Sequence, residues 1–119
     1  MTIHELSLES GPEHALRAIR EASATSAALV FKYSPICPIS HRAEGELDRF
    51  LEAIDPASEL ALARIDVIGR RPLARGLTDE LGLRHESPQA LWFRAGELTW
   101  HGSHGELTRE RFAELMGHS

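Results

Sequence analysis

The sequence predicts an α/β fold with a central mixed sheet flanked by helices. Three observations lead to this prediction. Segments with helical spacing of apolar residues alternate with short strand-like runs. The unbroken apolar run Ala27–Phe31 is typical of a strand covered on both faces. Two apolar-aromatic runs near the C-terminus are joined through a glycine, as in an antiparallel hairpin. The expected order is β-α-β-α-β-α-β-β-α, in one domain covering residues 1–119.

The first part of the chain contains an edge strand, a helix and the central strand. Residues 2–8 alternate weakly and suit a short edge strand. Ser10 and Glu13 have the spacing of a capping box, with Pro12 in the first turn of the helix. The inward positions of this helix are Ala15, Leu16, Ile19 and Ala22. Ala27–Phe31 then forms the central strand.

The longest helix follows Cys37 and ends at Asp55-Pro56. Its predicted apolar face consists of Ile39, Ala43, Leu47, Phe50, Leu51 and Ile54. The next strand is Leu60–Val67. A strand-helix-strand unit of this length favours a parallel pair joined by a right-handed crossover.

The last part of the chain predicts two more helices around a hairpin. Pro72 opens a helix that Gly82 closes as a left-handed cap. The hairpin pairs residues 89–94 with residues 97–101 across the turn Ala95-Gly96. Thr108 caps the final helix. The inward residues of these two helices are Leu73, Leu77, Leu81, Phe112, Leu115 and Met116.

The overall charge and hydropathy exclude several classes of function. With 13 Lys+Arg against 18 Asp+Glu, the net charge of -5 argues against nucleic acid as a partner. The longest apolar run is far shorter than the roughly 20 residues of a membrane span. The first residues lack the basic and apolar segments of a signal peptide, so we expect a cytoplasmic protein.

The sequence holds one cysteine, so any disulfide must be with another molecule. If the helix starts at Pro38, Cys37 is its N-cap, and the sulfur lies near the amides of Ile39 and Ser40. Helix N-termini lower a cysteine pKa from about 8.5 into the range of roughly 3.5 to 7.5. The thiolate is the nucleophile of disulfide exchange, so we expect a reactive thiol. The alternative is a small buried hydrophobe.

Two polar residues in the first turn could assist this thiol. Ser40 can donate a hydrogen bond to the sulfur but cannot form a disulfide, which predicts a monothiol cycle. The alternative for Ser40 is an ordinary first-turn residue. His41 could stabilise the thiolate or donate a proton to the leaving sulfur. An exposed or capping histidine is the alternative.

The remaining polar residues give weaker signals. Two histidines three residues apart, His101 and His104, with His85 upstream, lack a settled third ligand, so we expect no metal. Lys32 and Arg84 could meet a ligand carboxylate, but solvated surface charge is the favoured interpretation of both. Ser87-Pro88 directly before a strand indicates an edge strand or a cis bond in a tight turn.

Taken together, these features resemble the thioredoxin fold, and more narrowly the small YtxJ-type monothiol bacilliredoxins. The resemblance runs from about Leu29 to Thr108. Its segments are Cys37-Pro38-Ile39-Ser40-His41, Asp66-Val67-Ile68, His85-Glu86-Ser87-Pro88-Gln89-Ala90 and Trp100-His101-Gly102-Ser103-His104. Ile36 departs from the small or polar residue expected just before the cysteine, which bears on partner preference.

The resemblance implies a thiol-disulfide oxidoreductase that removes bacillithiol from mixed disulfides of S-thiolated client proteins. Cys37 would be the nucleophile and Pro88 the cis-proline lining the site. The backbone of Ser87 would pair with the chain of the bound thiol. The expected substrate-binding residues are Pro38, Ile39, Ser87 and Pro88. The small thiol is a co-substrate, and no permanently bound cofactor is expected.

Two other functions remain open at this point. The chain could be a binding or scaffold protein that kept the fold and lost turnover. It could also be a cluster carrier like the monothiol glutaredoxins. The carrier is disfavoured because Pro38-Ile39 replaces the Gly-Phe of their motif and one chain offers no second thiolate.

Overall fold

The computed structural model describes residues 2–9 and 11–117. Its elements follow the predicted order, with one additional 3-10 turn, η1, before the last helix. They are β1 (Ile3–Glu5), α1 (Pro12–Ala22), β2 (Ala27–Tyr33), α2 (Pro38–Ala53), β3 (Leu60–Asp66), α3 (Arg71–Glu80), β4 (Gln89–Arg94), β5 (Glu97–Ser103), η1 (His104–Glu106) and α4 (Arg109–Gly117). None of the helices in this described part is long and apolar enough to cross a membrane.

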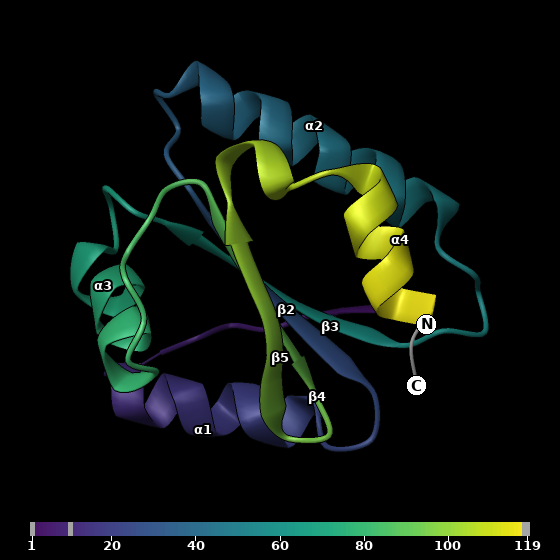
Figure 1. Ribbon diagram of the computed structural model, residues 1–119. Coiled ribbons are helices and arrows are strands. Elements are labelled where there is room, and N and C mark those ends of the chain that lie inside the picture. The colour runs from purple at the N-terminus through teal and green to yellow at the C-terminus, as the bar shows by residue number, and fades with distance from the viewer. Residues whose placement is uncertain (1, 10, 118–119) are drawn as a thin grey trace.

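The sheet has five strands in the order β1-β3-β2-β4-β5. β2 lies at its centre, parallel to β3 and antiparallel to β4, which confirms a mixed sheet with a central strand after α1. In Figure 1 the helices α1 and α3 lie on one side of the sheet, and α2 and α4 lie on the other. The sheet is therefore the middle of three layers, and each face must be apolar.

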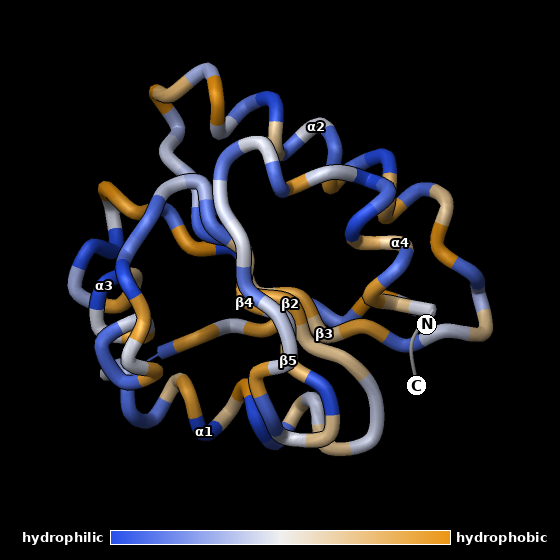
Figure 2. Tube along the Cα trace, in the orientation of Figure 1, coloured by the Kyte–Doolittle hydropathy of each residue, from blue (hydrophilic) through white to orange (hydrophobic). Residues whose placement is uncertain are grey.

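β2 supplies both cores because its side chains alternate between the faces. Ala28 and Val30 pack on the side of α1 and α3, whereas Leu29 and Phe31 pack on the side of α2 and α4. The hydrophobic colour of the crossing central strands in Figure 2 shows the same concentration of apolar residues. This double burial explains why the central strand has an unbroken apolar sequence rather than an alternating one.

Most predicted ends of elements are confirmed. The backbone N–H of Arg111 donates to Thr108 Oγ1 at 3.1 Å, so Thr108 caps α4. Gly82, with φ of 68°, follows α3 in the left-handed region. One prediction was wrong: Ile39 is 52% exposed instead of facing the core. It lies in the first turn of α2. The capping role predicted for Ser10 lies outside the described residues.

Candidate active site

Cys37 is the N-cap of α2, and Pro38 is the first residue of the helix, as predicted. β2 ends at Tyr33, and the chain then turns, with the Cys37 N–H donating to the Ser34 carbonyl at 3.3 Å. Proline suits the first helical position because it has no N–H to leave unsatisfied and its φ is already helical. The sequence after β2 therefore starts the helix directly behind the cysteine.

The surroundings of Cys37 favour its thiolate. The backbone N–H of Ser40 lowers the pKa of the thiol most, followed by the N–H of Ile39 and, more weakly, by the Ser40 hydroxyl. Partial removal from water acts in the opposite direction but does not reverse the shift. The side chain is only half-buried, so a reacting disulfide can reach the sulfur. The lowered pKa agrees with the effect expected of a helix N-terminus.

Ser40 connects the turn before the helix to the helix itself. It is only 1% exposed, and its hydroxyl oxygen accepts a hydrogen bond from the Ser34 N–H at 3.0 Å. A hydroxyl that accepts one bond keeps its own proton free to donate. That proton is the one that acts on the Cys37 sulfur.

His41 contacts the backbone of the same turn. Its Nε2 lies 2.9 Å from the carbonyl oxygen of Pro35, an acceptor, so this nitrogen carries the proton and donates it. The ring is exposed and is not among the groups that lower the pKa of Cys37. The exposure of the ring matches the alternative of an exposed histidine, and a role of His41 in proton transfer stays a prediction.

The Ser87-Pro88 peptide bond is cis. The pairing of β2 with β4 ends with Lys32 opposite Gln89. Ser87 and Pro88 therefore lie at the C-terminal end of β2, the end from which the chain continues to Cys37. The carbonyl of Pro88 accepts a hydrogen bond from the His104 N–H at 3.2 Å. The Oγ of Ser87 is buried and has no hydrogen-bond partner.

The structure corrects the interpretation of Lys32 as a solvated surface charge. Lys32 is fully buried, and its Nζ donates to Gln89 Oε1 at 2.7 Å and to His85 Nδ1 at 2.8 Å. Burial is the main cause that lowers its pKa to about 8, and the charge of Arg75 adds to the effect. Arg84 is exposed, as expected. The error arose because the polar partners of Lys32 lie far away in the sequence.

The histidines considered for a metal do not form a cluster. Among residues 2–9 and 11–117, no three His, Cys, Asp or Glu side chains are placed to hold a metal ion. His85 contacts Lys32 instead. Burial, followed by the charge of Lys32, lowers the pKa of its imidazole. His101 and His104 are exposed.

Exposed isoleucines flank Cys37 in the sequence. Ile36 and Ile39, on either side of Cys37 in the sequence, are 81% and 52% exposed. Ile68, in the turn after β3, is also exposed. The sequence did not predict that Ile68 is exposed, because an apolar residue just after a strand can be either buried or exposed. The segment that carries Cys37 therefore exposes apolar side chains before and after the cysteine.

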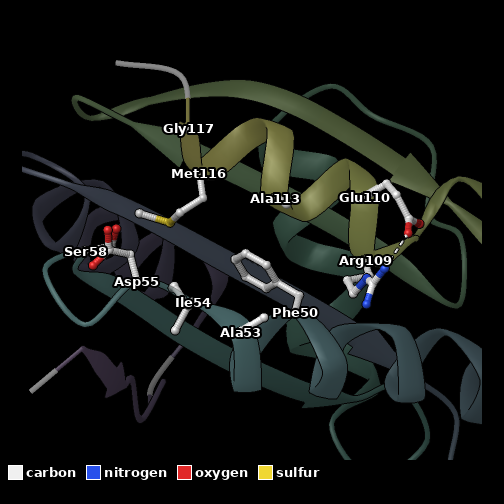
Figure 3. A pocket seen from close by; sticks show the side chains of 10 residues that line it. All are labelled: Phe50, Ala53, Ile54, Asp55, Ser58, Arg109, Glu110, Ala113, Met116 and Gly117. Carbon is white, nitrogen blue, oxygen red and sulfur yellow. Dashed lines mark hydrogen bonds and ion pairs between the residues drawn. The ribbon is translucent and has the colours of Figure 1, made fainter.

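A pocket of about 470 Å³ lies elsewhere, between the C-terminal half of α2 and α4. Figure 3 shows Phe50 and Met116 in it, with Asp55 and Arg109 toward opposite ends. Cys37 does not line it. The candidate site at Cys37 is thus separate from this pocket.

Ser40→Ala should raise the pKa of the Cys37 thiol, because it removes the hydroxyl donor and keeps both amides. The rise should be only part of the total shift, since the amides contribute more. The rate of alkylation by iodoacetamide, followed against pH, measures the midpoint. A wild-type midpoint at or above the ordinary value of about 8.5 would contradict the electrostatics of the site.

Known proteins resemble this chain in both sequence and fold. The family model described as "Monothiol bacilliredoxin BrxC" matches residues 10–112. A solved structure described as a candidate oxidoreductase with a thioredoxin fold is 26% identical, with a TM-score of 0.72, and the match covers 96% of this chain and 93% of that one.

Two further structures are similar in fold. Desulfothioredoxin from Desulfovibrio vulgaris Hildenborough, in its reduced form, is 24% identical, with a TM-score of 0.61 and coverage of 97% of this chain and 96% of that one. Trxlp from Edwardsiella tarda EIB202 is 17% identical, with a TM-score of 0.67 and coverage of 98% and 100%. The α/β fold described above is thus a thioredoxin-like fold.

Proposed function

The chain belongs to the family of monothiol bacilliredoxins, and from that premise we propose that Cys37 removes a low-molecular-weight thiol from protein mixed disulfides. The family and the fold make the protein a thiol oxidoreductase of the thioredoxin-like class. The observation that carries the finer proposal is the position of the one cysteine at the N-terminus of α2, where the amides of Ser40 and Ile39 lower its pKa.

The proposed reaction has two exchange steps. The Cys37 thiolate attacks the small-thiol sulfur of a mixed disulfide, so the client leaves as a thiolate and a disulfide forms between Cys37 and the small thiol. The thiolate of a second small-thiol molecule then attacks that disulfide. It releases the symmetric small-thiol disulfide and restores the Cys37 thiolate. No electrons are lost or gained overall, and reduction of the released disulfide falls to a separate reductant.

The other site residues have supporting roles in this proposal. Ser40 stabilises the thiolate and the departing sulfur. Pro38 and Ile39 line the approach to Cys37, and Ser87 with Pro88 lines the other side. Bacillithiol is the proposed small thiol, from the family alone, and S-thiolated proteins are the clients. A reducing compartment such as the cytoplasm keeps this thiol available.

Incubation with a symmetric small-thiol disulfide should add one small-thiol unit to the wild-type protein and none to Cys37→Ser. Intact mass spectrometry measures the adduct, and addition of the free small thiol should remove it. Absence of the adduct from the wild type would defeat the monothiol mechanism. The same experiment with the disulfides of bacillithiol, glutathione and coenzyme A in parallel identifies the preferred small thiol as the one whose adduct forms fastest.

A further inference from the structure

Lys32 occupies a position that would suit an apolar side chain. It lies in the central strand, opposite Ile65 of β3 and Gln89 of β4, and is fully buried. Within the described residues 2–9 and 11–117, no carboxylate lies within 4.0 Å of its ammonium group. Burying an ammonium group without a counter-ion costs free energy. Such a residue needs a role that an apolar residue could not fill.

Both side-chain hydrogen bonds of Lys32 go to residues 84–89, the segment that carries Ser87 and Pro88. Its ammonium donates to His85 Nδ1 at 2.8 Å and to Gln89 Oε1 at 2.7 Å. An ammonium group has no lone pair, so His85 is the acceptor and carries its proton on Nε2. The lowered pKa of His85 keeps the imidazole neutral, as this contact requires.

Gln89 extends the contact across the loop. Its Oε1 also accepts the Glu86 N–H at 3.2 Å, and its Nε2 donates to the Arg84 carbonyl at 3.0 Å. On the other side, the Pro88 carbonyl is held by the His104 N–H. Ser87 and Pro88 thus lie between a buried network built on Lys32 and the start of η1.

The charged groups around Lys32 leave its ammonium protonated at neutral pH. Arg75 of α3 opposes the charge, and Asp79 of α3 and Glu86 of the loop favour it. His85 faces it as a neutral acceptor. A pKa of about 8 keeps most of the group charged at pH 7. Hydrogen bonds from a charged donor are about twice as strong as neutral ones, and low dielectric surroundings strengthen them further.

We propose that Lys32 is a buried positioning residue that holds the loop of residues 84–89, and with it Ser87 and Pro88, in the geometry that disulfide exchange at Cys37 requires. This inference rests on the proposed function. It does not require Lys32 to touch the substrate. It predicts that loss of Lys32 affects reactions with disulfide partners and spares the intrinsic reactivity of the thiol.

The variant Lys32→Met tests this, because methionine fills a similar volume and donates no hydrogen bond. The rate of exchange with a small-thiol mixed disulfide should fall roughly tenfold or more, because the variant removes both hydrogen bonds that Lys32 donates to the loop. Alkylation by iodoacetamide, and its pH midpoint, should not change, because Lys32 is not among the groups that shift the pKa of Cys37. Amide hydrogen exchange at Glu86 should become faster.

Arg84→Met is the matched control, because it removes a cation from the same loop but from an exposed side chain. It should keep the wild-type rates. Gln89→Met should reproduce the effect of Lys32→Met, and the double variant should add little, since both act through one network. Gln89→Met carries the test if Lys32→Met does not fold.

Wild-type exchange rates in Lys32→Met and Gln89→Met would overturn the inference. So would an equal loss of alkylation and exchange, because that would indicate a change at the thiol or in the whole fold. If the wild type forms no mixed disulfide at all, the proposed function fails by itself. The hydrogen exchange of Glu86 then still decides whether Lys32 holds the loop.

Discussion

Cys37→Ser should reduce removal of the small thiol from an S-thiolated client protein to the rate measured without enzyme. Serine has no thiolate to attack the disulfide, and the sequence holds no second cysteine that could replace Cys37. The release of the client thiol, followed by mass spectrometry or by recovery of the client's activity, measures the reaction.

This variant separates chemistry from folding. Serine is among the preferred N-cap residues, so the start of α2 should be kept or strengthened. We therefore expect the melting temperature to equal or exceed that of the wild type. Turnover by the serine variant at a rate close to the wild type would contradict Cys37 as the nucleophile and favour a scaffold or another reactive group.

Phe112→Ala should destabilise the fold by about 3–5 kcal/mol, the usual cost of deleting a buried phenylalanine side chain. Phe112 is fully buried and packs against Phe50 of α2, with the ring centroids 5.7 Å apart. The loss is a large part of the roughly 5–15 kcal/mol that stabilises a typical domain. Urea unfolding, with midpoint and slope fitted together, measures it.

Glu114→Ala in the same helix is the matched control. Glu114 is exposed, and its ion pair with Arg111 at 3.6 Å lies on the surface, so its loss should cost within about 0.5 kcal/mol. In both variants the folded protein should keep the wild-type pH dependence of Cys37 alkylation. The groups that shift the pKa of Cys37 belong to α2, and none of them belongs to α4. If Phe112→Ala had the same free energy of unfolding as the wild type, packing of α4 against the core would not contribute to stability.

Local sequence predicted the parts of the site that depend on neighbouring residues. Cys37, Pro38 and Ser40 lie within one helical turn, so the cap, the amides and the hydroxyl follow from the order of residues. The unbroken apolar sequence of β2 likewise predicted its central position, because such a strand requires cover on both faces. The observed order β1-β3-β2-β4-β5 confirms it. The predicted burial of Ile39 was wrong because helical periodicity assigns a residue to a face of the helix but does not say how much of that face is covered.

The sequence by itself determined the fold class, the position of Cys37 at the N-cap of a helix and the absence of a second thiol in this chain, since each depends on composition or on residues a few positions apart. Only the tertiary structure decided the burial of Lys32 and its hydrogen-bond partners. Its two partners lie 53 and 57 positions away, and pairing of β2 with β4 brings them together. A lysine alone carries no sign of burial, because the free energy cost of burying it is offset by partners that only the folded chain supplies.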